Sequence, residues 1–382
     1  MIIEQISWRE KSGWSELTES GIKFKANLVL AFGGRNALES KKHFDEIKSF
    51  YPNSNILICS TAGEIIGSEV LDDSIIVTAI YFERTELQVF STDIASLNMS
   101  YESGKNLAGL FPKERLSHIF VISDGQLVNG SELVRGMSDA LPPDVSMTGG
   151  LAGDGARFQK TLVGLNDYPS EGKIAAVGFY GSNLKIGYGS IGGWDSFGPE
   201  RLITRSENNI LYELDGQSAL GLYKNYLGEL AEGLPGNALL FPLSIKVPDS
   251  IEPVVRTILS IDEANQSMTF AGDIPRGALA RLMKANFDRL IEGASLAAVN
   301  SSLVNEGNSP DIAILISCIG RKIVLGQRIE EEVEGVREVL GNKTILLGFY
   351  SYGEISPFSR SGKCQLHNQT MTITTITEGK EQ

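Results

Sequence analysis

Apolar runs of strand length alternate along the chain with polar stretches that carry one apolar face at helical spacing. Leu28–Phe32 and Ile56–Cys59 are apolar runs that predict two strands. Between them, Phe44, Ile47 and Tyr51 share one face of a predicted helix. A strand, a helix and a second strand of this combined length form the crossover that joins two parallel strands of one sheet.

The same order recurs twice, so the chain carries a repeat of three units. The second unit places predicted strands at Ile119–Ser123 and Val145–Thr148, with an amphipathic helix capped by Ser131 between them. The third unit places strands at Ile312–Ser317 and Thr344–Phe349, again around a predicted helix.

Further apolar runs predict strands with antiparallel partners. Ser74–Phe82 and Leu87–Ser91 predict one strand pair across a charged turn, and Ile174–Tyr180 and Leu184–Tyr188 predict another. Thr370–Ile376 is the returning strand of the third unit. Parallel crossovers combined with antiparallel partners predict a mixed α/β (α+β) fold with mixed sheets.

The region between the second and third units has a different pattern. A hairpin is predicted at 202–214, a helix at Ala219–Leu230, and strands at 238–247, 254–261 and 267–270. Gly277–Leu303 is predicted to be one long Ala-rich helix, whereas residues 1–26 give only a turn and a short strand edge. A turn at Leu234–Asn237 predicts two packed domains, 25–236 and 237–377.

Composition narrows the class of function. A hydrophobic content of 42% and a charged content of 21% are typical of a globular protein. The formal charge of −13 disfavours nucleic acid and anionic membrane surfaces, and favours a cationic or zwitterionic small ligand. The chain starts with no basic-then-apolar leader, and no run approaches the ~20 apolar residues of a membrane helix. We therefore expect a cytoplasmic protein without nucleic acid or membrane insertion.

Strong catalytic signatures are absent from the sequence. It has no H-E-x-x-H, no paired C-x-x-C and no P-loop, and Phe349 replaces the first glycine of a G-x-S-x-G around Ser351. Three cysteines, Cys59, Cys318 and Cys364, do not make a disulfide framework. Cys318 lies near an arginine that could lower its thiol pKa, and the competing interpretation is a buried small hydrophobe.

The candidate ligand-binding residues cluster at the end of the second predicted strand of each unit. Two of these ends read Gly-Glu-Ile, at Glu64 and Glu354, and a looser version is Gly-Asp at Asp154. Each carboxylate either bonds to local backbone N–H groups or holds an ammonium or guanidinium group of a ligand. Nearby Tyr350 and Tyr352 could close such a pocket through cation–π contacts. Amides around Gly149, Gly150 and Gly153 could receive an anionic group. The full candidate ligand-binding set is Glu64, Thr61, Gly149, Gly150, Gly153, Asp154, Tyr350, Tyr352, Glu354 and Asn368.

Two alternatives stay open from the residues alone. The same carboxylates could perform acid–base catalysis, although the sequence offers no nucleophile or metal site beside them. The histidines His43, His118 and His367 have no metal-ligand spacing, yet any of them could ligate haem iron. We expect no enzyme activity and no cofactor, with haem as the exception to test.

Several short sequence segments together resemble the family called FIST. Its N-terminal domain is suggested by 60–65, 149–155, 192–199, 210–216 and 219–228, and its C-terminal domain by 317–321, 348–357 and 367–370. The resemblance implies a signal-transduction sensor that binds a small ligand such as an amino acid. Members occur beside or fused to histidine kinases, cyclic-dinucleotide enzymes and chemoreceptors, and some bacterial members bind haem and sense nitric oxide. The chain carries no recognisable kinase or cyclase segment, so we expect a signalling partner in trans.

Overall fold

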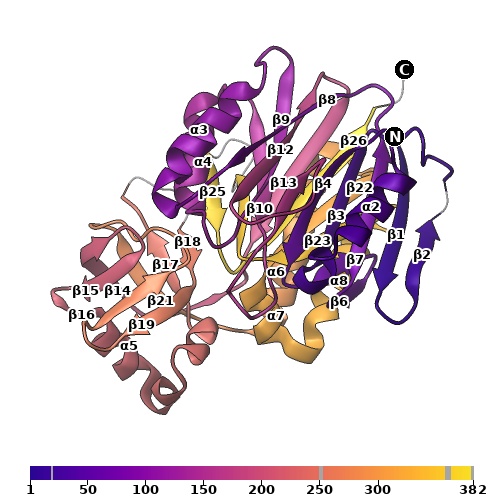
Figure 1. The fold of residues 1–382 in the computed structure, drawn as a ribbon. Helices are drawn as coiled ribbons and strands as arrows, with labels where there is room; N and C mark the ends of the chain where they lie inside the picture. Colours follow the sequence, from indigo (N-terminus) through magenta and orange to yellow (C-terminus); the bar gives the residue numbers. More distant parts are fainter. Residues whose placement is uncertain (19, 249–252, 358–362, 380–382) are drawn as a thin grey trace.

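The computed structural model describes residues 1–18, 20–248, 253–357 and 363–379. The fold is α+β, as predicted. A body contains three six-stranded sheets, and a smaller lobe (residues 195–284) contains one eight-stranded sheet. The lobe lies at the lower left of Figure 1, and the N-terminus lies at the upper right, on the side of the body away from the lobe. None of the described helices is long and apolar enough to cross a membrane.

Each sheet of the body is mixed and contains the two parallel strands of one repeat unit. In order across each sheet, the first contains β11 (Val163–Leu165), β4 (Asn55–Thr61), β3 (Leu28–Gly34), β7 (Ile75–Tyr81), β1 (Ile2–Arg9) and β2 (Gly13–Thr18). The second contains β25 (Cys364–His367), β24 (Gly353–Pro357), β10 (Ser146–Leu151), β9 (Leu116–Ser123), β12 (Lys173–Tyr180) and β8 (Glu86–Asp93). The third contains β13 (Leu184–Ile191), β26 (Met371–Glu378), β22 (Ile312–Cys318), β23 (Ile345–Ser351), β5 (Glu64–Ile66) and β6 (Glu69–Leu71).

The predicted crossovers are confirmed in all three units. The strands β3 and β4, β9 and β10, and β22 and β23 pair in parallel. The helices between them are α1 (Arg35–Leu38), α2 (Lys41–Phe50), α4 (Gly130–Ala140), α7 (Ile319–Leu325) and α8 (Ile329–Leu340). Helix α3 (Ser100–Leu110) packs on α4, and α6 (Phe287–Ser302) packs on α8. Asn129, rather than the predicted Ser131, caps α4 through its side chain.

The units exchange strands in a closed cycle. The segment after each crossover leaves its own sheet, so that β5 pairs with β23, β24 pairs with β10, and β11 pairs with β4. The ends of the three second strands also exchange backbone hydrogen bonds in a ring. The bonds run from Ala62 N to Tyr350 O (2.8 Å), from Tyr352 N to Leu151 O (3.2 Å), and from Gly153 N to Ser60 O (2.9 Å). The three units are therefore related by an approximate three-fold arrangement around these strand ends.

The sheets enclose a shared apolar core. Phe32, Phe120 and Phe349 come from the three different sheets and belong to one buried cluster. The rings of Phe32 and Phe349 lie 4.7 Å apart between centroids. Burial of these aromatic side chains stabilises the packing of one sheet on the next.

Two predicted strand pairs are wrong. Strand β7 pairs with β3 and β1 in the first sheet, whereas β8 pairs with β12 in the second sheet. Likewise, β12 pairs with β9 while β13 pairs with β26 in the third sheet. A short turn between consecutive strands predicts a hairpin, but here the turn carries the chain from one sheet to the next.

The lobe has its own core, and one of its strands occupies part of a predicted helix. It contains β14 (Asp195–Glu207), β15 (Ile210–Leu214), β16 (Gln217–Ser218), α5 (Ala219–Leu227), β17 (Leu243–Lys246), β18 (Val254–Arg256), β19 (Ile258–Asp262), β20 (Ser267–Phe270) and β21 (Leu279–Lys284). The predicted helix Gly277–Leu303 is wrong over its first part, because β21 pairs with β14 and β17 and α6 begins at Phe287. The expected domain boundary at 236 and 237 lies inside this lobe.

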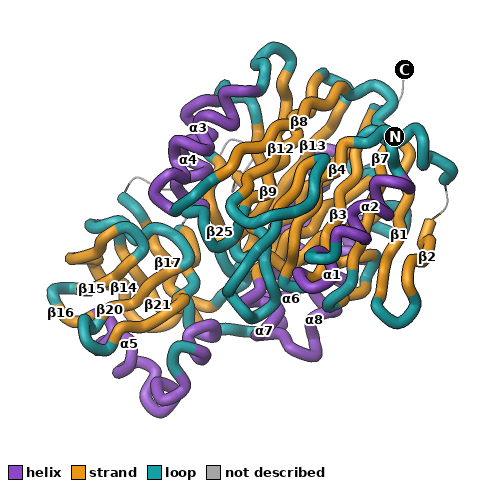
Figure 2. Tube along the Cα trace, in the orientation of Figure 1, coloured by secondary structure: helices purple, strands orange, loops and turns teal. Residues whose placement is uncertain are grey.

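The remaining elements are two N-terminal strands and several short 3₁₀ turns. The sequence pattern predicts no strand at β1 or β2, but β1 pairs with β7 from Ile2 to Trp8 and extends the first sheet. Figure 2 shows the loops and turns (teal) that join the strands (orange). Short 3₁₀ turns connect several elements. They are η1 (Leu97–Met99), η2 (Gly228–Gly233), η3 (Gly236–Leu240), η4 (Leu303–Asn305) and η5 (Gly326–Arg328).

Candidate functional site

Glu64 sits at the first strand end with its carboxylate fully buried. The hydroxyl of Thr61 donates to one carboxylate oxygen. The other oxygen accepts from the backbone N–H of Ser74 at 3.0 Å and from its hydroxyl at 2.7 Å. Burial raises the pKa of Glu64 to about 7, against the lowering effect of these hydrogen bonds.

Glu354 repeats this geometry in the third unit. Ser351 Oγ donates to one carboxylate oxygen at 2.8 Å, and the N–H and hydroxyl of Thr370 donate to the other at 3.2 and 2.9 Å. Burial raises the pKa of Glu354 to about 8. In both units the carboxylate joins the strand end to the residue just before the returning strand. Protein donors thus occupy the oxygens that were expected to hold a ligand, and ligand binding there stays a prediction.

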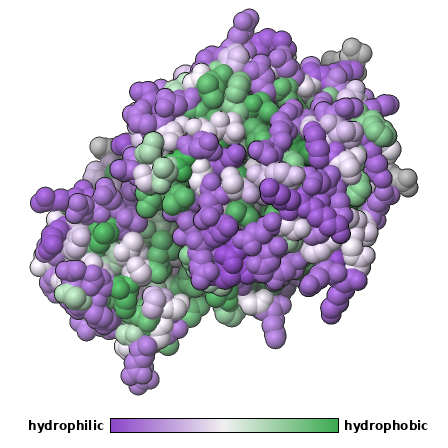
Figure 3. All heavy atoms as spheres, viewed as in Figure 1, coloured by the Kyte–Doolittle hydropathy of each residue, from purple (hydrophilic) through white to green (hydrophobic). Residues whose placement is uncertain are grey.

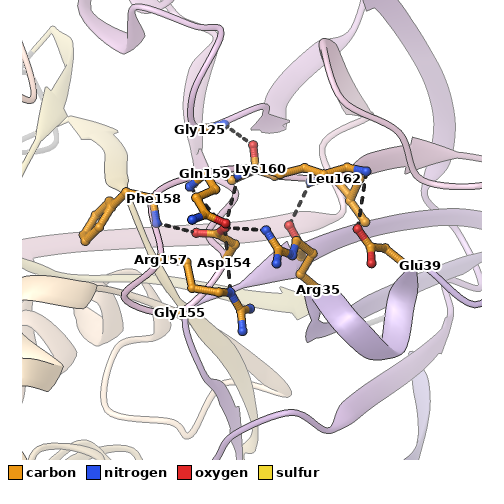
Figure 4. A network of polar contacts seen from close by, with 12 residues as sticks. Arg35, Glu39, Gly125, Asp154, Gly155, Arg157, Phe158, Gln159, Lys160 and Leu162 are labelled. Atoms are coloured by element: carbon orange, nitrogen blue, oxygen red, sulfur yellow. Dashed lines mark hydrogen bonds and ion pairs between the residues drawn. The ribbon is translucent and has the colours of Figure 1, made fainter.

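Asp154 differs from these glutamates by one position. In the ring of strand ends, Gly153 stands where Ala62 and Tyr352 stand, so Asp154 corresponds to the glycines before the two glutamates. Its buried carboxylate accepts from the backbone N–H groups of three consecutive residues at 2.9 to 3.2 Å, as Figure 4 shows. The three are Phe158, Gln159 and Lys160. These hydrogen bonds hold the loop that follows Asp154 around its carboxylate.

Arg35 of the first unit and Tyr352 of the third unit both bind the carboxylate of Asp154. The guanidinium of Arg35 donates to Asp154 at 3.0 Å, and the hydroxyl of Tyr352 donates to its other oxygen. The backbone N–H groups of Asp154 and Phe158 donate in turn to the Tyr352 hydroxyl at 3.1 and 3.2 Å. Burial raises the pKa of Tyr352 well above its usual range, so the phenol remains a neutral donor.

The expected anion-binding amides lie inside the sheet. Gly149 and Gly150 belong to β10, which pairs with β9 on one side and with β24 on the other. The N–H of Gly153 donates to Ser60 in the ring. A Cβ on Gly149 would overlap the carbonyl oxygen of Val121, so this glycine allows the close approach of β10 and β9. Packing and strand pairing account for these glycines.

A large cleft opens where the body meets the lobe. Its volume is about 840 Å³, which is within the range of small-molecule sites. In Figure 3, hydrophobic side chains (green) gather at this junction. The body supplies Leu97, Asn98, Gly125, Gln126, Val128, Asn129, Glu132, Leu151, Phe158, Cys318, Ile319 and Tyr352. The lobe supplies Asn208, Asn209, Pro235, Gly236, Leu239, Thr257, Ile258, Leu259, Phe270, Ala271 and Gly272.

An aromatic wall closes one side of the cleft. The rings of Phe158 and Tyr352 are stacked, with centroids 4.6 Å apart and planes 22° apart. Asp154 positions both residues, since it binds the N–H of Phe158 and the hydroxyl of Tyr352. A flat apolar group or a cation would pack well on this wall. Within the candidate set, Tyr352 is the residue that the described lining contains.

Polar groups around the cleft are mainly amides. Glu132 is the charged residue in the described lining, and its carboxylate also pairs with exposed Arg135. The Asn129 side chain donates to Asp273 of the lobe at 3.0 Å. Thr257 is 5% exposed, and its hydroxyl finds no hydrogen-bond partner among the described residues. The cleft can therefore bind a largely apolar molecule with a few hydrogen-bonding groups and a positive end.

The other candidate residues lie behind the lining. Tyr350 is fully buried and donates to Glu332 at 2.8 Å, while Lys322 lies 5.4 Å from the centre of its ring. This cation–π contact joins two protein groups. Asn368 is 1% exposed at the end of β25, and Thr61 is 2% exposed beside Glu64.

The described histidines and cysteines do not form a metal site. His118 contacts the hydroxyls of Ser146 and Thr148 at 2.7 and 3.0 Å, and burial lowers its pKa to about 3. His367 contacts Ser356 O at 2.9 Å, and burial lowers its pKa to about 4.

Within the described chain, no group of three His, Cys, Asp or Glu residues could hold a metal, and His43 lies against Trp8 with ring centroids 4.3 Å apart. None of the three histidines is in the described cleft lining, so they do not fit a haem bound there.

Cys318 lines the cleft floor but is not activated. Burial raises its thiol pKa well above the usual range, which corrects the reactive-thiol interpretation. Most cleft residues come from loops or from lobe strands whose sequence pattern does not indicate that they meet the body. The amide-rich pairs Asn208-Asn209 and Asn98 beside Leu97 resemble ordinary turn residues in the sequence. Sequence reasoning therefore could not find this cleft.

Comparisons with known proteins agree on one family. The profile of the FIST N domain matches residues 27–217, and the profile of the FIST C domain matches residues 219–357. An uncharacterized protein of Methanocaldococcus jannaschii is 23% identical over 345 residues, which cover 82% of this chain. The aligned part spans 63% of that relative's length.

Proposed function

Because the chain belongs to the FIST family, whose domains are signal-transduction sensor domains, we propose that it is a sensor whose small ligand binds in the cleft between body and lobe. The observation that carries this proposal is the cleft itself, a volume of about 840 Å³ with an aromatic wall and amide groups. Clefts between structural units are common ligand sites, because a ligand there contacts both parts at once.

The ligand is an amino acid or a similar amine-bearing metabolite. Glu132 is the charged group of the described lining and sits on α4, in its first turn. The chain's formal charge of −13 adds a negative field that favours a cationic end. The stacked Phe158 and Tyr352 rings would hold the apolar part of the same molecule.

Binding would be reported by a change in how the lobe sits on the body. Two hydrogen bonds join these parts near the cleft, from Asn129 to Asp273 at 3.0 Å and from Arg256 to Leu366 O at 2.9 Å. A ligand that contacts both walls stabilises the closed arrangement by its differential affinity. The changed surface would then act on a separate cytoplasmic partner, such as a histidine kinase or a cyclic-dinucleotide enzyme.

A thermal-shift screen of amino acids and related amines tests this function. We expect at least one amine to raise the melting temperature of the wild type. The same compound should raise that of Glu132→Gln by less, because the variant lacks the carboxylate. A screen in which no amine shifts the wild type, or in which Glu132→Gln responds equally, would reject the amine-sensor proposal.

A further inference from the structure

Two buried amide side chains lie beside residues that line the cleft. The side chains of Asn368 and Gln369 are 1% and 0% exposed. None of their four amide nitrogen and oxygen atoms has a hydrogen-bond partner among the described residues. A buried amide that lacks a partner costs free energy unless water or a ligand satisfies it. Two consecutive residues in this state offer unused donors and acceptors to water or to the polar group of a ligand.

Their position links them to the cleft. The Gln369 amide covers Gly320, two residues after Cys318 of the cleft floor. Asn368 Nδ2 lies 3.6 Å from the position that a Cβ on Gly353 would take, in the residue after the tyrosine of the aromatic wall. Each amide therefore lies against a glycine that follows a residue of the cleft lining, Ile319 or Tyr352.

The opposite wall supplies a third unsatisfied group. Thr257 lines the cleft, and its hydroxyl is buried without a partner among the described residues. The preceding residue, Arg256, donates to Leu366 O at 2.9 Å, two residues before Asn368. The segments that carry Thr257 and the two amides are therefore in contact at the junction of lobe and body.

The first and third units differ at the positions of these two amides. Counted back from the residues that hold the two equivalent glutamates, Asn368 and Gln369 correspond to Asp72 and Asp73. Both second members have left-handed backbone, with φ of 62° at Gln369 and 51° at Asp73. In the first unit, Asp72 pairs with the ammonium of Lys322. The third unit has a neutral amide at this position, and the described residues leave it unpaired.

We propose that Asn368, Gln369 and Thr257 form a subsite for a neutral carboxamide group of the ligand, an inference that rests on the proposed function. Each amide offers two donor hydrogens and an acceptor oxygen, which complement a carboxamide. Their lack of net charge disfavours a buried carboxylate, because an unpaired charge costs far more to desolvate than a neutral amide. Glu132 at the same cleft further disfavours an anion.

Matched pairs of probes test the subsite by isothermal calorimetry. L-Glutamine is compared with L-glutamate, and nicotinamide with nicotinate. We expect each carboxamide to bind the wild type at least about tenfold more tightly than its acid. Asn368→Leu removes one amide, and Gly320→Ala displaces the other, because the new Cβ would overlap the flexible end of Gln369. Both variants should lose the preference, whereas Asp72→Asn at the equivalent exposed position should keep it.

The outcomes separate this subsite from the proposed function. Equal binding of amide and acid by the wild type overturns the subsite, and so does an unchanged preference in both variants. If no carboxamide binds but an amine from the screen does, the subsite fails and the sensor function stands. If neither class binds the wild type, both are overturned.

Discussion

Glu64 and Glu354 make the same three hydrogen bonds in two repeat units: one from the hydroxyl three residues earlier and two from the residue just before the returning strand. The pKa values of about 7 and about 8 mean that the folded chain favours the protonated form more than the unfolded chain does. The carboxyl group of a glutamate in an unfolded chain has a pKa of about 4.3. These carboxyl groups therefore stabilise the fold fully below that pH.

Stability should fall as the pH rises through the window from about 4.3 to about 8, because the folded state binds more protons there. The double variant Glu64→Gln, Glu354→Gln imitates the neutral acids and should flatten this part of the profile. Melting temperatures across the window measure the effect. A variant whose slope equals that of the wild type would contradict the assignment.

The Asp154 carboxylate should contribute to both stability and cleft order. Asp154→Asn removes the charge that binds Arg35 and the backbone of the 158–160 loop, and we expect a loss of about 3 kcal/mol in unfolding free energy. Hydrogen exchange in that loop should accelerate. Arg157→Ala is the matched control, since Arg157 lies 3.9 Å from Asp154 and is 34% exposed. Its cost should stay below about 1 kcal/mol, and a loss as large as that of Asp154→Asn would refute the distinction.

Gly149 should be required for packing rather than for binding an anion. In Gly149→Ala, the methyl group would overlap the Val121 carbonyl, and we expect a loss of about 3 kcal/mol or more. Gly109→Ala on α3 meets nothing within 4 Å and should be neutral or slightly stabilising. Chemical denaturation compares the two, and a Gly149→Ala protein as stable as the wild type would contradict the packing role.

Asn368→Leu should stabilise the ligand-free protein. Replacing a buried amide that has no described partner by an apolar side chain of similar size removes a desolvation cost of about 1 kcal/mol or more. A raised melting temperature together with weakened carboxamide binding would show that the position serves the ligand at the expense of stability. A clear fall in melting temperature would indicate a structural role for Asn368.

The sequence predicted the repeat well because each unit combines local signals. The run Leu28–Phe32 and the helical face at Phe44 and Ile47 follow from short-range physics and are confirmed. The destinations of β8 and β13 could not be predicted, because a short turn does not specify which sheet the next strand joins. The first part of the long predicted helix is a strand instead: Ala280 and Leu282 alternate onto its buried face, and a short apolar run does not distinguish this pattern from a helix.

The candidate site was predicted only in part for a related reason. Glu64 and Glu354 stand out as a repeated phrase, yet their regularity reflects a hydrogen bond that the fold itself uses twice. Tyr352 was found because it belongs to the same phrase. The lobe residues that complete the cleft, such as Thr257 and Gly236, reach it only through tertiary packing.

Calorimetry on a blocked cleft tests the central claim most directly. Gly236 lines the cleft, and a Cβ there meets nothing within 4 Å, so Gly236→Trp adds an indole at the cleft wall without a clash at its Cβ. Gly109→Trp, on the outer side of α3 with equal space, is the control. With the strongest ligand from the amine screen, we predict that Gly236→Trp abolishes the binding heat and that Gly109→Trp retains it. Binding to Gly236→Trp with the affinity of the wild type would contradict a ligand site between body and lobe.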